Sequence, residues 1–285
     1  MVLCYMDARS TGAFGPEAET LFSWNSQKFQ RLVAFHDKPS DQDGGKPIDT
    51  LFDSFLFSSN TWYDGKMFWP GLGLPMNRTD WEGVLDIYLD QGAQNLNAAA
   101  ANISTQLPMR NGCSSGLSMP IVLSIPYPDP RQQHFGILNN RSLNFSVPED
   151  RLEAVQWWLT LATNKFLQRG FSNVRLAGFY WFLEEVPGGD EILLPAVSAA
   201  IKKIDSSLMF VWIPYYRPGD PHTSQWKTYG FDMVTIQPNY AFNNITAADR
   251  FPKIELLMNN DGLGVELELD YNIRNPEAGG WQGVS

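Results

Sequence analysis

Apolar segments of strand length recur along the chain, and segments with helical periodicity separate them. Short apolar runs rich in aromatic and β-branched residues, bounded by Gly, Pro and Asp, predict β-strands. The pattern predicts strands over residues 2–6, 51–59, 119–130, 174–183, 208–216, 231–242 and 264–270.

Amphipathic helices are predicted between these strands, from a cap at Thr79 or Asp80, over 148–170, 190–204 and 247–259. A capping box of Ser146 and Glu149 marks the start of the second helix, and Gly170 marks its end. Residues 20–36 fit a strand or the end of a helix equally well. A long aromatic segment, 60–79, follows the second strand and has no period. It is expected either to carry substrate contacts or to cap the core with its own rings.

Strands that alternate with helices predict repeated βα units and a parallel sheet. Seven such strands in 285 residues favour one domain, 1–285, with an α/β fold of the (β/α)₈ TIM-barrel class. No glycine fingerprint follows the first strand, which disfavours a dinucleotide-binding fold. The last residues, from 271 on, do not read as an eighth strand. Either the chain is truncated at its C-terminus, or the barrel closes in another way.

Two of the predicted strands end in carboxylates. The run GFYWFLEEV, 178–186, passes from buried aromatic residues directly to Glu184 and Glu185. In GVELELD, 264–270, Glu266, Glu268 and Asp270 alternate with aliphatic residues, so period two places all three acids on one face. Acids on an otherwise interior strand are costly to bury unless they serve a site. These two strands are therefore expected to supply a catalytic pair.

The other expected strand ends carry amides, phenols and a further acid. In a (β/α)₈ barrel the active site lies at the C-terminal ends of the strands. Flat rings stack on sugar faces, while amides and phenols bond to hydroxyl groups, so this inventory favours a carbohydrate substrate. The candidate substrate-binding residues are Asp7, Trp62, Tyr127, Tyr180, Tyr216, Gln237, Asn239 and Tyr240.

The segments GFYWFLEE, VWIPYY, GFDMVTIQPNYAF and GVELELD, in this order, resemble the family called domain of unknown function 4855. That family is similar to (β/α)₈ glycoside hydrolases, although no reaction is assigned to it at large. Retaining glycosidases of the large barrel clan carry the acid/base after strand four and the nucleophile after strand seven. The resemblance implies these roles for Glu184 and Glu268. The chain departs from that clan in having Leu183, not Asn, before the strand-four Glu.

The implied reaction is a double displacement, in which Glu184 protonates the leaving oxygen and Glu268 attacks the anomeric carbon. Glu266 is the alternative nucleophile. It precedes Glu268 by two residues, so it is expected on the same face of the strand but deeper in the barrel. Simpler roles stay open: Glu184 and Glu185 would also suit a helix N-terminus. Glu266 would also suit an internal ion pair with Arg175.

Other functions fit the same residues. A carbohydrate-binding barrel without catalysis would keep the rings and amides. A carbohydrate lyase or a transglycosylase would keep the carboxylates as well. Binding without turnover, or sugar rather than water as the acceptor, would distinguish them.

Composition narrows the partners further. A net charge of −10 without any block of Lys and Arg disfavours nucleic acid and anionic membranes. No apolar run approaches the length of a membrane span, and the first residues do not form a signal peptide. Two cysteines and three widely spaced histidines predict no metal site and no cofactor. The oligomeric state stays open.

Sequons of the type Asn-x-Ser/Thr favour a secreted or extracytoplasmic location, although in a bacterial protein they would carry no meaning. They lie at Asn77, Asn102, Asn140, Asn144 and Asn244.

Overall fold

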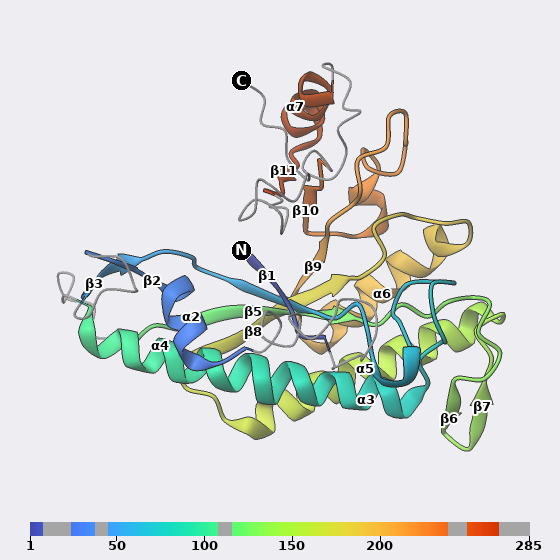
Figure 1. Cartoon of the computed structure of the whole chain (residues 1–285). Helices are drawn as coiled ribbons and strands as arrows, with labels where there is room; N and C mark the ends of the chain where they lie inside the picture. Colours follow the sequence, from blue (N-terminus) through green and yellow to red (C-terminus); the bar gives the residue numbers. More distant parts are fainter. Residues whose placement is uncertain (8–23, 38–44, 108–115, 239–249, 268–285) are drawn as a thin grey trace.

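The computed structural model describes residues 1–7, 24–37, 45–107, 116–238 and 250–267. Its main element is a parallel sheet of seven strands whose order in space equals their order in the chain (Figure 1). The strands are β1 (Val2–Tyr5), β4 (Phe55–Ser58), β5 (Met119–Ile125), β8 (Val174–Trp181), β9 (Met209–Trp212), β10 (Met233–Ile236) and β11 (Gly264–Val265).

Helices follow most of these strands, as expected for βα units. They are α2 (Ser26–Val33), α3 (Arg78–Ile87), α4 (Gln94–Gln106), α5 (Pro148–Arg169), α6 (Asp190–Ile204) and α7 (Arg250–Asp261). Figure 1 shows α3 and α4 end to end below the sheet with α5 beside them, while β10, β11 and α7 rise above it. The sheet is therefore curled as a half-barrel, and an eighth strand is not among the described residues.

Smaller elements complete the described chain. A π-helical turn, η2 (Tyr88–Ala93), joins α3 to α4, and the 3₁₀ turns are η1 (Tyr63–Gly65) and η3 (Trp226–Tyr229). Two antiparallel hairpins stand apart from the main sheet: β2 (Ala34–His36) with β3 (Pro47–Thr50), and β6 (Gly136–Leu138) with β7 (Arg141–Leu143). The segment 20–36 is thus helical first and extended afterwards in its described part.

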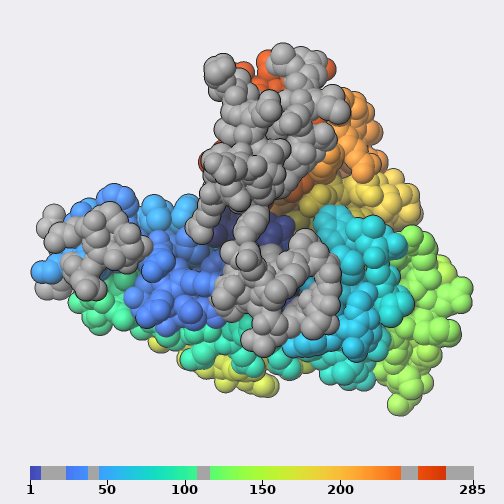
Figure 2. Space-filling model, viewed as in Figure 1, coloured from blue at the N-terminus to red at the C-terminus, as the bar shows by residue number. Residues whose placement is uncertain are grey.

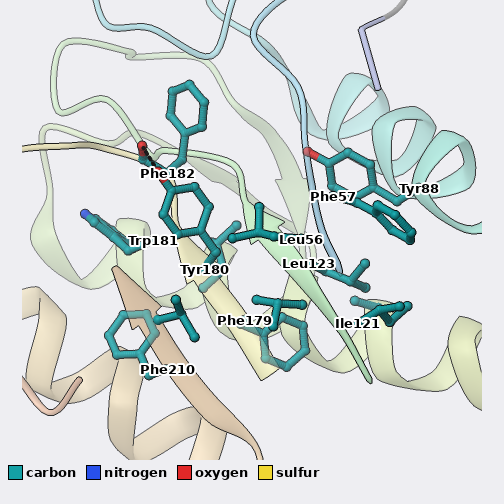
Figure 3. Close-up of a cluster of buried hydrophobic side chains, with 14 of the residues drawn as sticks. Leu56, Phe57, Tyr88, Ile121, Leu123, Phe179, Tyr180, Trp181, Phe182 and Phe210 are labelled. Atoms are coloured by element: carbon teal, nitrogen blue, oxygen red, sulfur yellow. Dashed lines mark hydrogen bonds between the residues drawn. The ribbon is translucent and has the colours of Figure 1, made fainter. Parts of the chain in front are cut away.

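The core lies between the sheet and the helices. Phe179 on β8 contacts Trp158 on α5 with ring centroids 6.0 Å apart, so this side of β8 faces the helix layer. Tyr180, the next residue, faces the inside of the curl, and the alternation continues along the strand. Figure 3 shows Phe179, Tyr180 and Trp181 in succession along β8, with their rings pointing in different directions.

Strand ends coincide with prolines. Pro126, Pro214 and Pro238 follow β5, β9 and β10 by one or two residues, and proline cannot donate a ladder hydrogen bond. For this reason the strands are shorter than the apolar runs that predicted them.

Two predicted helix caps are wrong, although the helices themselves are present. Asn77 caps α3, in a capping box with Asp80. Val147 stands at the cap position of α5 and makes no side-chain cap bond, while Ser146 bonds to Asn144 instead. Pro148 at the first position already removes one of the N–H groups that a cap would satisfy.

Candidate functional site

Three carboxylates follow described strands of the sheet at the same end. Asp7 lies two residues beyond β1, Glu184 three beyond β8, and Glu266 directly after β11. All three side chains are half-buried. Since the strands are parallel, this is the end at which α/β proteins place their ligands.

Two buried tyrosines, Tyr5 and Tyr180, each interact electrostatically with both Glu184 and Glu266. Burial raises the pKa of Tyr5, and the negative charges of Glu184, Glu266 and Asp7 raise it further. Burial likewise raises the pKa of Tyr180, with further increases from Glu184 and Glu266. Charges change a pKa strongly only at short range. Both carboxylates therefore lie near both phenols, although β8 and β11 are three strands apart in the sheet.

The curl of the sheet explains this meeting. β1 and β11 are the two edges of the described sheet, yet Tyr5 on β1 lies within electrostatic reach of Glu266 after β11. In the register of β10 and β11, Gly264 lies opposite Thr235 and Val265 opposite Ile236. Because residues two apart in a strand share a face, Glu266 lies on the same face as Gly264, which is the inner face of the curl. The Glu266 amide donates to the Ile236 carbonyl at 2.9 Å, which extends the β10 pairing to the carboxylate itself.

The backbone that carries Glu184 is held by β9. The indole N–H of Trp212 donates to the Leu183 carbonyl at 2.8 Å, and the Tyr215 amide donates to the Glu184 carbonyl at 3.0 Å. Leu183, two residues beyond β8, thus contributes a backbone acceptor rather than a polar side chain. Glu185 turns away and forms an ion pair with Arg217, 2.6 Å between Nη1 and Oε2.

Asp7 ties β1 to the loop after β4. Its Oδ1 accepts hydrogen bonds from the Ser59 hydroxyl and from the backbone N–H groups of Asn60 and Thr61. Burial nonetheless raises its pKa, and the hydrogen bonds only partly oppose this. Asp7 therefore holds the loop backbone beside the two glutamates.

A third phenol approaches from the helix layer. Tyr88 begins the π-helical turn η2 and is fully buried, and burial holds its pKa well above the usual value. Its hydroxyl lies beside Ser58, Ser59 and Ser124 at the ends of β4 and β5. π-helical turns are frequent at functional sites because the extra residue re-aims a side chain.

The other predicted substrate-binding residues lie around this centre at different depths. Tyr127 is buried, and its hydroxyl accepts from Arg151 at 3.2 Å. Tyr216 is buried, with the Arg250 guanidinium 5.6 Å from its ring centroid. The backbone N–H of Gln237 donates to the Pro214 carbonyl at 2.9 Å, and the Gln237 side chain is half-buried.

Trp62 lies against α3, where a Cβ on Gly83 would come within 2.7 Å of its ring. That contact makes it part of the loop core. Glu268, Asn239 and Tyr240 lie outside the described residues. Arg175 is exposed at the start of β8, at the opposite end of the strand from the three carboxylates.

Tyr5 stands with Asp7 at the predicted end of the first strand, and the structure ends β1 at Tyr5. Tyr88 and Asn60 were missed as members of the site. For Tyr88 the sequence carried no signal, since its spacing from Trp81 and Leu85 fits the apolar side of a helix.

Neither a metal site nor a membrane-spanning helix is found in the described ranges. No group of three His, Cys, Asp or Glu side chains within them could hold a metal ion. None of the helices in these ranges is long and apolar enough to cross a membrane.

The protein is thus a mixed α/β protein with a curled parallel sheet and an acidic, phenol-lined centre at the C-terminal ends of its strands. The chain belongs to the family described as Domain of unknown function (DUF4855), which it matches over residues 13–282. This confirms the family resemblance of the four segments. No curated protein matches the chain.

Proposed function

We propose that the protein is a glycoside hydrolase in which Glu184 and Glu266 are the catalytic carboxylates. One observation carries the proposal: both carboxylates raise the pKa of the same two buried phenols, Tyr5 and Tyr180. A pair of carboxylic acids at one site is the minimal requirement for cleaving a glycosidic bond. We propose Glu266 for the role that the resemblance implies for Glu268, because Glu266 acts on Tyr5 and Tyr180 whereas Glu268 lies outside the described residues.

The proposed reaction has two displacements. Glu184 gives its proton to the glycosidic oxygen while a carboxylate oxygen of Glu266 attacks the anomeric carbon, and the bond to the leaving alcohol breaks. Glu184, now ionised, takes a proton from water. The hydroxide portion attacks the anomeric carbon, and the bond to Glu266 breaks, which restores both side chains.

The phenols support this chemistry as donors. With their pKa values raised, Tyr5 and Tyr180 keep their protons throughout the neutral range. A protonated phenol beside a carboxylate can donate to it and hold one oxygen in place. The Tyr180 hydroxyl already donates to the Phe182 carbonyl at 3.4 Å, as the dashed line in Figure 3 marks. In the proposal, Tyr5 orients Glu266 and Tyr180 fixes the chain just before Glu184.

We also propose that the curled sheet represents seven strands of a (β/α)₈ barrel. The sequential parallel order supports this, since each strand of such a barrel pairs with its neighbours in the chain. In that numbering Glu184 follows strand four and Glu266 follows strand seven.

The test is hydrolysis of soluble polysaccharides of several backbones, such as glucans, xylans, mannans and galactans, by the full chain. Glu184→Gln is expected to lower kcat by about 10²–10⁴-fold, the usual contribution of a catalytic acid or base. Glu266→Gln removes the nucleophile and is expected to lower kcat at least as much. Glu185→Gln is the matched control, because Glu185 adjoins Glu184 but pairs with Arg217. Its activity should stay near that of the parent.

Recovery of activity by azide in alanine variants identifies which glutamate is the nucleophile. Glu266→Ala should recover turnover with azide and release a glycosyl azide, because a small anion can enter the space of the missing carboxylate. Rescue of Glu268→Ala instead would move the role to Glu268. Sugar binding without turnover in the parent protein would replace the proposal by a carbohydrate-binding barrel. An unsaturated product would indicate a lyase, and sugar as sole acceptor a transglycosylase.

A further inference from the structure

A pocket of about 270 Å³ lies between the loops that follow β4 and β5. This is near the lower limit of the roughly 300–1,000 Å³ that ligand pockets span, and the lining is mostly apolar with a few polar groups, as in such pockets. The residues that matter for its chemistry are Phe68, Trp69, Trp81, Tyr127, Asp129 and Arg131. Figure 2 shows the two parts of the chain, residues 60–80 in light blue and residues 125–145 in green, as neighbours on one face.

The pocket shares a wall with the carboxylate site. Phe182, two residues before Glu184, packs on Trp69 with ring centroids 4.9 Å apart and on Phe68 at 5.4 Å. Asn60 connects them from the other side. Its side-chain oxygen accepts from the Trp69 indole at 3.0 Å, while its backbone N–H donates to Asp7.

The lining suits a sugar ring. Trp69 is half-buried, whereas Trp81 and Tyr127 are 1% and 5% exposed, so Trp69 presents the accessible aromatic face. At the rim, the Arg131 guanidinium donates to both oxygens of Asp129 at 2.6 to 3.2 Å. Its side chain is 62% exposed, which leaves further N–H donors for hydroxyl groups. A pyranose has apolar C–H faces and hydroxyl groups at its edge. The Trp69 ring suits the apolar face, and the charged donors and acceptors of Arg131 and Asp129 suit the hydroxyl groups.

Both walls are fixed in place. In the first loop, Lys66 forms an ion pair with Asp80 at 2.8 Å. In the second loop, the buried Arg151 donates to the Pro128 carbonyl at 2.7 Å and to Asp190 at 2.7 Å. A preorganised pocket loses little entropy when it binds a ligand.

We infer that this pocket is a sugar-binding subsite for the ring next to the cleaved bond. Trp69 stacks on the ring, and Asp129 and Arg131 bond to its hydroxyl groups. The placement of the scissile bond rests on the proposed function. The substrate class that follows is an oligosaccharide or polysaccharide rather than a monoglycoside.

The experiment measures equilibrium binding by calorimetry in the full chain carrying Glu184→Gln, which removes turnover. The probes are cello-, xylo-, manno- and chito-oligosaccharides, each as a disaccharide and a hexasaccharide. Trp69→Ala and Arg131→Ala are each expected to weaken hexasaccharide binding by roughly tenfold or more, since each removes a ring contact or a charge-assisted hydrogen bond. Arg131 is exposed, so its variant is expected to fold even where the loss of Trp69 perturbs the loop.

Two variants serve as matched controls. Trp157→Ala removes another half-buried tryptophan, on α5, and Arg169→Ala removes an arginine near the other end of the same helix. Both should bind the hexasaccharide as the Glu184→Gln parent does.

Hydrolysis by the wild-type chain is scored separately, so the two proposals can fail independently. Hydrolysis together with unchanged hexasaccharide affinity in Trp69→Ala and Arg131→Ala would overturn the subsite and leave the hydrolase. Binding that depends on Trp69 and Arg131 without hydrolysis would keep the subsite and overturn the hydrolase. Absence of both would overturn both.

Discussion

Tyr5 on the first strand and Glu266 after the last described strand lie within electrostatic reach of each other, although their strands are the two edges of the sheet. The phenol keeps its proton because burial and the neighbouring carboxylates raise its pKa. In the proposal, this phenol donates a hydrogen bond that stabilises the charged form of Glu266.

Tyr5→Phe should therefore move the acid limb of the kcat/KM profile to higher pH. Loss of a hydrogen bond to a charged group costs about 1.5–3 kcal/mol, which corresponds to roughly a ten- to hundredfold lower rate. The measurement is the pH dependence of hydrolysis. Tyr63→Phe, at an exposed tyrosine of η1, is the control and should leave the profile unchanged. An acid limb that stays in place would show that Tyr5 does not donate to the reacting carboxylate.

Asp7→Asn tests the burial of a carboxylate at the same end of the sheet. Burial raises the pKa of Asp7, so the folded state binds this proton more tightly than the unfolded state does. The associated stability is fully present below the usual Asp pKa of about 3.9 and is lost as the pH rises through the higher folded value. The free energy of unfolding of wild type minus that of Asp7→Asn should fall across this window and then level off. Urea unfolding at a series of pH values measures it, and a difference that rises with pH would contradict the assignment.

Asp190→Asn breaks the buried ion pair that fixes the loop after β5. The Arg151 and Asp190 side chains are 5% and 0% exposed, and their N–O distance is 2.7 Å. Removal of one partner of a buried pair costs about 3–5 kcal/mol. Asp90→Asn is the control, because Asp90 pairs with Arg169 at 53% side-chain exposure, where such pairs contribute only about 0–1 kcal/mol. Equal losses in the two variants would mean that the Arg151 pair is already solvated.

Gly178→Ala tests the close approach of β8 and β9. A Cβ at Gly178 would lie 2.2 Å from the Met209 carbonyl oxygen, and backbone cannot move aside as a flexible side chain can. We expect a loss at or above the upper end of the about 1–3 kcal/mol that overpacking usually costs. Gly188→Ala is the matched control, since nothing lies within 4 Å of its added Cβ. Chemical denaturation measures both, and a near-neutral Gly178→Ala would show that the strands can separate locally.

The sequence was most informative where one physical rule dominated. The helix over 190–204 was predicted with the bounds that the structure has, because Asp and Glu begin it and an apolar stripe runs its full length. The parallel order of strands followed from their alternation with helices. The family was also identified correctly, from GVELELD and three other segments.

Hairpin β6–β7 was missed although its turn carried a local signal. Asn139 and Asn140 occupy φ values of 48° and 63°, the pair of left-handed positions that a two-residue hairpin turn requires. Asparagine tolerates that conformation better than most residues, so an Asn-Asn pair between short apolar runs predicts such a turn. The flanking strands were too short for their own periodicity to show.

The site could be predicted only in part. Strand parity determines which face of a strand a side chain is on, but it does not determine how far the sheet curls. Parity puts Glu266 on the same face of β11 as Gly264. It could not show that Tyr5 would meet Glu266, since that depends on how far the sheet curls. Nor could it show Tyr88, which reaches the strand ends from a helix through a π-helical turn.

The sequential order of the sheet has a consequence for synthesis. Each new strand can add to the edge formed by the one before it, so the sheet can grow in the order in which the ribosome delivers the chain. The cluster of Tyr5, Tyr180 and Glu266 cannot form strand by strand, because its members come from the first, fourth and seventh strands of the sheet. A nascent chain can therefore hold most of its sheet while this centre is still open, and the centre forms only when β11 arrives.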